Sequence, residues 1–228
     1  MCGRYALEST LKDLEETYGA IPDGYFEMEA SYNVAPTDIM PVIVESDKGH
    51  RTVTGYRWGL VPPWSKEIPT SRPLINARSE TLSVKKTFLQ PFRTKRCVIP
   101  ASGFFEWKKG SKGKTPHYIT LSTDRLMSFA GLYEHWKYPD GRVLGSYAII
   151  TTPASTSIEP LHDRMPAILL PEEIDIWLDS ANHDIRALGE LLTPYAKDGT
   201  KYHTVSKQVN NVRNNGASLI EPLRDLFG

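Results

Sequence analysis

Cys2 follows Met1 directly, and its chemistry depends on whether that methionine is removed. Cys is small enough at the second position for Met1 to be cleaved, which would leave Cys2 with a free α-amine two carbons from its thiol. Such a 1,2-aminothiol attacks an aldehyde through nitrogen to give an imine, and the sulfur then closes a thiazolidine ring. Reference pKa values of about 7.7–8.0 for the amine and about 8.5 for the thiol leave roughly a tenth of the amine neutral at pH 7. The alternative interpretation is an incidental, frayed terminus.

Three polar residues elsewhere lie in contexts that suit a site. Asn76 precedes an expected helix, where it either caps the helix or directs its amide at a ligand. Glu106 lies between aromatic residues, and apolar neighbours raise the pKa of a carboxyl group toward the range of a general acid or base. His162 has an acid and a base directly beside it, which suits proton transfer. The ordinary alternatives are a helix cap, an exposed strand carboxylate paired with a lysine, and a surface histidine.

Charge is unevenly distributed along a chain that is neutral as a whole, with 27 basic and 27 acidic residues. Residues 1–50 hold ten acids and three bases, a net charge of 3 − 10 = −7, whereas residues 81–115 hold nine bases and one acid, a net charge of 9 − 1 = +8. Neutrality argues against a protein that coats nucleic acid, and the basic segment suits a polyanion held in one groove. A solvated edge or loop explains the lysines equally well.

The segment from Trp58 to Trp64 is rigid and aromatic, with two consecutive prolines before its second tryptophan. Either the two rings pack in the core or they offer a surface on which unpaired bases stack. The sequence alone leaves both interpretations open.

Composition and spacing argue against several classes of protein. No apolar run approaches the roughly 20 residues needed to span a bilayer, and the first residues lack the layout of a signal peptide, so we expect a cytoplasmic protein. Cys2 and Cys97 do not make a disulfide framework, and Cys97 lies in an apolar stretch typical of a buried structural thiol. Histidines and cysteines lack the spacing of zinc ligands and the glycines form no phosphate-binding loop, so we expect no metal and no cofactor.

The pattern of apolar residues predicts an α+β fold. A first helix ends at Tyr18, because Leu7, Leu11, Leu14 and Tyr18 recur at helical spacing between the candidate caps and Gly19. Further helices are expected at Ser79–Gln90, Pro171–Leu178 and Asp184–Leu192. Strands are expected at Pro41–Glu45, Thr52–Trp58, Arg96–Pro100, Phe104–Lys108, His117–Leu121, Met127–Glu134, Ser146–Thr151 and Ala167–Leu170. Because the strands lie too close together for repeated βαβ units, we expect one domain over residues 1–228, with a curled, mostly antiparallel, barrel-like sheet and flanking helices.

Seven sequence blocks, in order along nearly the whole chain, closely resemble the SRAP family, the SOS-response-associated peptidase domain that is also called abasic-site-processing protein. The blocks are Met1-Cys2-Gly3-Arg4-Tyr5, Tyr32-Asn33-Val34-Ala35-Pro36, Arg57 to Trp64, Ile75-Asn76-Ala77-Arg78-Ser79-Glu80, Phe105-Glu106-Trp107-Lys108, His162-Asp163-Arg164-Met165-Pro166, and Val205-Ser206 with Asn210 to Gly216. Several distinctive blocks in order are far more specific than any one of them.

The resemblance implies a sensor of abasic sites in single-stranded DNA that shields the lesion through a thiazolidine crosslink at Cys2. It implies that Asn76 recognises the lesion, and that Glu106 and His162 move protons during sugar opening and imine formation. The implied DNA-contacting residues are Arg4, Arg78 and Arg164 for phosphates, Lys86 where family members can use Arg, and Thr151 lining the site. Trp58 or Trp64 would stack on a neighbouring base, and β-elimination from the imine would give lyase activity as a side reaction.

The expected partner is single-stranded DNA containing abasic sites, bound by a monomer that is cytoplasmic and nucleoid-associated when on DNA, with no membrane partner.

Three rival functions remain. N-terminal-nucleophile amidotransferases also begin with Cys-Gly after Met removal, although here Arg4 follows and no second synthase-sized domain is present. A peptidase would release Cys2 by autoproteolysis or cut other proteins, and a non-covalent DNA-binding module would leave Cys2 without a role.

Overall fold

A five-stranded closed barrel forms the larger part of the fold in the computed structural model, which describes residues 2–24, 26–46, 48–69, 71–111, 113–123, 126–195 and 199–223. Its strands are β4 (Ile39–Glu45), β5 (Arg51–Trp58), β7 (Arg96–Ala101), β10 (Met127–Lys137) and β11 (Val143–Pro153). Neighbours in the order β5-β4-β7-β10-β11 are antiparallel, and parallel pairing of β11 with β5, Ser146 opposite Arg57, closes the barrel. The predicted α+β class with a mostly antiparallel, barrel-like sheet is confirmed.

Short strands extend the barrel sheet at its edges. They are β2 (Ile21–Pro22), β6 (Asn76–Arg78), β12 (Arg164–Pro166) and β13 (Ile168–Leu169). β6 runs parallel to β11 with Asn76 opposite Ile149, and β12 runs antiparallel to it with Met165 opposite Thr152. The segments that carry Asn76 and His162 are therefore both anchored on β11.

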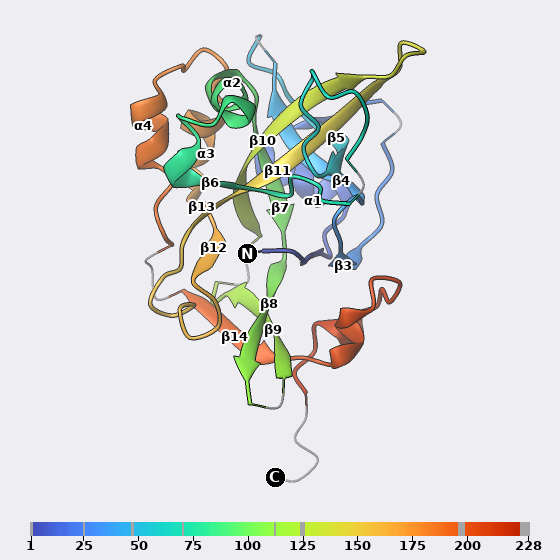
Figure 1. Cartoon of the computed structure of the whole chain (residues 1–228), viewed down its shortest axis with the longest axis vertical. Helices are drawn as coiled ribbons and strands as arrows, with labels where there is room; N and C mark the ends of the chain where they lie inside the picture. Colours follow the sequence, from blue (N-terminus) through green and yellow to red (C-terminus); the bar gives the residue numbers. More distant parts are fainter. Residues whose placement is uncertain are drawn as a thin grey trace.

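A second, antiparallel sheet has the strand order β14-β9-β8-β1-β3. Its strands are β1 (Tyr5–Leu7), β3 (Ser31–Val34), β8 (Gly103–Gly110), β9 (Gly113–Leu121) and β14 (Thr200–Thr204). Figure 1 shows this sheet below the barrel, with β7 leading down into β8 and the first described residues between the two sheets. The short strands β1, β3 and β14 were not predicted, since three to five residues carry little periodicity.

The helices lie mostly on one side of the barrel (Figure 1). They are α1 (Leu11–Tyr18), α2 (Lys86–Thr94), α3 (Pro171–Leu178) and α4 (Ile185–Glu190), with 3-10 turns η1 (Ser79–Thr81), η2 (Lys207–Asn210) and η3 (Ala217–Leu219). The first helix is confirmed: the Thr10 side chain caps it, and Gly19 ends it with φ of 59°. No helix in the described stretches is long and apolar enough to cross a membrane.

The predicted helix Ser79–Gln90 is wrong over its first half, because the chain makes the turn η1 and begins α2 only at Lys86. Leu82 and Phe88 are both buried in the same part of the core. Six residues apart, they would point to different sides of one continuous α-helix, and the extended backbone at Lys85 allows both to be buried. The other predicted helices match α3 and α4 to within two residues, and the single-domain organisation stays a prediction.

Candidate functional site

Cys2 lies at the junction of the two sheets with no exposed surface. Its thiol donates a long hydrogen bond to the carbonyl oxygen of Arg4, with 3.7 Å between Sγ and O. The Asn76 side chain, carried by β6, donates from Nδ2 to the Cys2 carbonyl oxygen at 2.8 Å. Asn76 does not cap a helix, since η1 begins after Arg78 and has no side-chain cap. Its amide instead holds the backbone of the candidate nucleophile.

Glu106 is brought beside this segment by sheet register. β8 pairs with β1 through Phe104 and Tyr5, and the amide of Phe105 donates to the Arg4 carbonyl at 3.0 Å. One further step of this antiparallel ladder places Glu106 opposite Gly3. The carboxyl group is buried, with 3% exposure, and burial raises its pKa above the usual range. Burial also raises the pKa of the Cys2 thiol, and the negative charge of Glu106 raises it further.

His162 lies on the loop between β11 and β12, on the same cleft as Glu106. A positive charge on this ring lowers the pKa of Glu106 and so opposes part of the increase caused by burial. The two groups are therefore close enough to interact electrostatically. The ring Nδ1 lies 3.0 Å from the backbone amide of Arg164 and 2.8 Å from Asp163 Oδ1. The cleft has a volume of about 320 Å³, and its lining residues are Gly3, Arg4, Glu106, Trp107, Lys109, Lys114 and His162.

Arg4 forms one wall of this cleft and is held in place from behind. Its Nη1 donates to Asn33 Oδ1 at 2.7 Å and to the Val209 carbonyl at 2.9 Å, and its guanidinium lies 5.9 Å from the centre of the Trp107 ring. Burial lowers its pKa. Its Nε is buried without a hydrogen-bond partner in the described part of the chain. The half-buried side chain lines the cleft, which places its positive charge where a phosphate could bind.

The two tryptophans have different environments. Trp58 has no exposed surface: its ring is stacked against Tyr147 and its Nε1 donates to the Ile75 carbonyl at 3.0 Å. It therefore presents no face to a base, and the prediction that it contacts DNA does not fit this structure. Trp64 is 56% exposed, and the Lys86 ammonium lies 5.7 Å from the centre of its ring. Of the two interpretations, Trp58 is a core residue, whereas Trp64 and Lys86 form an exposed pair on which a base could stack.

Arg164 and Thr151 are paired with protein groups inside the fold. Both Nη atoms of Arg164 donate to the Glu80 carboxylate, and Nη2 also donates to the carbonyl and the Oγ1 of Thr151. Thr151 has no exposed surface, so it supports Arg164 and does not itself line the cleft. A phosphate at Arg164 would compete with Glu80, whereas Arg78 on β6 is exposed.

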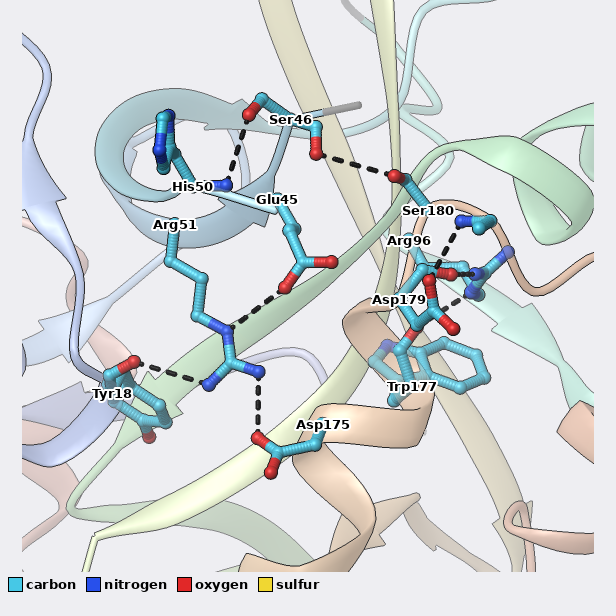
Figure 2. A network of polar contacts seen from close by, with 11 residues as sticks. Tyr18, Glu45, Ser46, His50, Arg51, Arg96, Asp175, Trp177, Asp179 and Ser180 are labelled. Atoms are coloured by element: carbon cyan, nitrogen blue, oxygen red, sulfur yellow. Dashed lines mark hydrogen bonds and ion pairs between the residues drawn. The ribbon is translucent and has the colours of Figure 1, made fainter. Parts of the chain in front are cut away.

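The basic segment at 81–115 does not form one surface. Arg96 is 4% exposed and donates to backbone carbonyls at the ends of α2 and α3, among them Trp177 O at 2.7 Å, as Figure 2 shows in part. Lys95 is ion-paired with Glu134 at 2.7 Å. Lys108, Lys109 and Lys114 are exposed on the β8–β9 hairpin, and the last two line the cleft. Lys112 lies outside the described residues.

Among four further residues that shape the site, sequence reasoning gave no role to Asn33 and Glu80, and it used Trp107 and Asp163 only as sequence neighbours of Glu106 and His162. All four stand inside sequence blocks that carry the resemblance, which was the available signal. Glu106 and His162 line one cleft together with Gly3. The adjacent residue Cys2, whose carbonyl oxygen accepts from Asn76, is buried. A thiol, an amide, a carboxyl group of raised pKa and an imidazole in this arrangement suit acid–base chemistry on a small electrophile. Among the described residues, no group of three or more His, Cys, Asp or Glu is placed to hold a metal ion.

Comparison with known proteins gives related sequences over most of the chain. Residues 1–212 match the family described as SOS response associated peptidase (SRAP). The abasic site processing protein YoqW of Bacillus subtilis is 43% identical over 225 residues, covering 97% of this chain and 99% of that protein. The abasic site processing protein HMCES of Gallus gallus is 34% identical over 224 residues, covering 85% of this chain and 66% of that protein.

Solved structures have the same fold. A crystal structure of a protein from Bacteroides thetaiotaomicron superposes with a TM-score of 0.84 at 25% identity, over 97% of this chain and 99% of that chain. A protein from Bordetella bronchiseptica superposes with a TM-score of 0.78 over 90% of this chain and all of the other, and at 24% identity it shows the fold alone.

Proposed function

Since this chain belongs to the SOS response associated peptidase (SRAP) family, we propose that it processes abasic sites in single-stranded DNA by crosslinking itself to the lesion through Cys2. The observation that carries the proposal is the cleft on which Glu106 and His162 meet the N-terminal segment, with Asn76 bonded to the Cys2 carbonyl. The relatives YoqW and HMCES bear the name abasic site processing protein. The chemistry requires that Met1 be removed.

The crosslink forms in two bond-making steps. The α-amine of Cys2 adds to the aldehyde carbon of the ring-opened sugar, and loss of one water gives the imine. The thiol then adds across the C=N bond, sulfur to carbon and proton to nitrogen, to give the thiazolidine. Glu106 and His162 supply and accept the protons of sugar opening and water loss, for which a carboxyl group of raised pKa is suited near neutral pH. Because burial keeps the Cys2 sulfur protonated, the amine reacts first.

DNA would follow exposed basic and aromatic groups of the protein. Trp64 with Lys86 offers a ring for base stacking, worth about 1–3 kcal/mol per base, and Arg78, Lys109 and Lys114 offer cations for phosphates. In this role the protein acts as a monomer, cytoplasmic and nucleoid-associated on DNA. Lyase cleavage through the imine is a side reaction, and autoproteolysis would release Cys2 by removing Met1.

A denaturing gel of the protein with an abasic single-stranded oligonucleotide tests the proposal. Wild-type protein should give a shifted band that survives denaturation, Cys2→Ala should give none, and Cys97→Ala, which removes the other buried thiol, should keep the band. Intact-protein mass spectrometry should show that Met1 is absent. A shifted band with Cys2→Ala, or retained Met1 in protein that crosslinks, would contradict the proposal. Hydrolysis of glutamine by the protein would favour the amidotransferase function. DNA binding without a shifted band on the denaturing gel would favour the non-covalent DNA-binding module.

A further inference from the structure

The side chain of Arg164 ties three elements together beside His162. Its two Nη atoms meet the two carboxylate oxygens of Glu80 in η1, and Nη2 also donates to Thr151 Oγ1 in β11 at 3.2 Å. The Arg164 side chain is only 11% exposed. Its hydrogen bond lowers the pKa of Glu80, which keeps the carboxylate charged. We call this set of contacts between Glu80, Arg164 and Thr151 the Glu80–Arg164 clamp.

The backbone of Arg164 in turn contacts the imidazole. Its amide N–H donates to His162 Nδ1 at 3.0 Å. A ring nitrogen that accepts a hydrogen bond carries no proton, so the neutral ring has its N–H on Nε2. Asp163 Oδ1 lies 2.8 Å from the same Nδ1 and is its partner when that nitrogen is protonated. Nδ1 therefore has two competing partners, one for each of its protonation states.

We propose that the Glu80–Arg164 clamp is a positioning device for His162: by fixing the backbone at Arg164, it holds the neutral imidazole in the form that carries its proton on Nε2. Glu80 would act through Arg164 and would not touch the DNA. The use of that N–H at the lesion rests on the proposed function, whereas the preference for the Nε2–H form rests on contacts in the free protein. The charged groups around the ring are Asp163 and Arg164 from its own segment, Glu106 from β8, and Arg4, Lys109 and Lys114 along the cleft.

Glu80→Gln weakens the clamp with little change of shape, and Glu159→Gln, which alters an exposed carboxylate of the segment between β11 and β12, is the matched control. Two-bond ¹H–¹⁵N NMR spectra of the free, ¹⁵N-labelled protein report which ring nitrogen carries the proton. We expect neutral His162 to be Nε2–H in the wild type and in Glu159→Gln, and Glu80→Gln to populate the Nδ1–H form. A wild-type ring protonated on Nδ1, or a Glu80→Gln spectrum identical to that of the wild type, would overturn the inference.

Crosslinking kinetics give the second readout. Single-turnover crosslinking by Glu80→Gln should be slower by about tenfold, because a small displacement of a reacting group lowers the rate. Affinity for an oligonucleotide with an unreactive tetrahydrofuran site should stay within about twofold of the wild-type value. Equal losses of rate and affinity would instead place Glu80 in DNA binding and refute the positioning role. If Glu80→Gln does not fold, Thr151→Val removes one acceptor of Arg164 and should shift the ring and the rate the same way. If the wild type forms no crosslink, the proposed function fails, and the NMR result still decides on the clamp.

Discussion

Buried polar groups are treated differently in two regions of this molecule. At the ends of α2 and α3, Arg96 is buried, and its Nε, Nη1 and Nη2 all donate to backbone carbonyls. The acceptors are the carbonyl oxygens of Phe92, Arg93, Trp177, Asp179 and Asn182. Around the N-terminal segment, Oδ1 of Asn76, which holds Cys2, and Nε of Arg4, which lines the cleft, are buried without partners in the described part of the chain. Complete pairing marks a structural group, whereas unused hydrogen-bonding capacity beside a cleft marks a group that a ligand can complete.

Arg96 should show the largest effect, because it is the most completely paired of these groups. Arg96→Met would remove the Arg96 donors from five carbonyl oxygens at two helix ends, of which the Asp179 oxygen keeps a bond from the Asn182 amide, so we expect a loss of about 3 kcal/mol in the free energy of unfolding. Urea denaturation measures the loss. Arg93→Met, at an exposed side chain on the same turn, should change stability little. A crosslinking rate per folded molecule that falls with Arg96→Met would show that this region is not purely structural.

Glu106 and Glu134 are two acidic residues that are equally buried, each with 3% exposure, but that have different partners. Glu134 accepts from Lys95 Nζ at 2.7 Å, so Glu134→Gln should lower stability and leave crosslinking unchanged. Glu106→Gln should slow crosslinking by about a hundredfold at pH 7, while affinity for unreactive abasic DNA stays nearly the same. A parallel fall of rate and affinity would assign Glu106 to binding or folding.

The raised pKa of Glu106 also fixes the sign of a pH effect. A carboxyl group whose folded pKa exceeds its unfolded value of about 4.3 stabilises the fold below that value, and this contribution is lost as the pH rises through the folded pKa. Above that range Glu106→Gln should therefore be as stable as the wild type or more stable, as thermal unfolding at several pH values will show. A variant less stable than wild type at pH 8 would mean that the ionised carboxylate is favourably bound.

Removal of cations from the cleft should give a smaller effect on binding. The double change Lys109→Gln with Lys114→Gln should weaken non-covalent binding of single-stranded DNA several-fold and reduce the salt slope by about 0.7 for each phosphate that is no longer neutralised. Fluorescence anisotropy across a salt series measures both quantities. Lys12→Gln with Lys48→Gln, on exposed positions of α1 and the β4–β5 turn, is the control and should leave the slope unchanged. Equal effects of the two pairs would indicate non-specific charge attraction.

The sequence predicted the elements whose pattern is local. α1 follows from apolar spacing between Thr10 and Gly19, and the long barrel strands follow from apolar runs between turn residues. Closure of the barrel by β11 and β5 was not predictable in detail, because it depends on pairing between segments about 90 residues apart. The break before α2 was missed for a similar reason: only the core shows that Leu82 and Phe88 are buried together.

The sequence predicted which residues belong to the candidate site, but not which groups they contact. The aromatic neighbours of Glu106 indicated burial and a raised pKa, and both are found. The bond from Asn76 to the Cys2 carbonyl depends on a strand that begins at Asn76 and pairs with β11, which no local pattern reveals. Likewise, the net charge of residues 81–115 does not distinguish a buried base from an exposed one. Arg96 is hydrogen-bonded inside the fold, whereas Lys109 and Lys114 line the cleft.

The smallest effect is expected at Asp175, within the polar network of Figure 2, where Arg51 Nη2 donates to Asp175 Oδ1 at 2.7 Å. The Asp175 side chain is 78% exposed, so solvent screens the pair, and Asp175→Asn should cost no more than about 1 kcal/mol. Glu45, which accepts from Arg51 Nε at 3.3 Å, has a side chain only 12% exposed, so Glu45→Gln should cost more. Urea denaturation at low and high salt measures both variants, and the Asp175→Asn loss should shrink at high salt. A salt-independent loss at Asp175 as large as that of Arg96→Met would mean that exposure does not separate the strong contacts of this region from the weak ones.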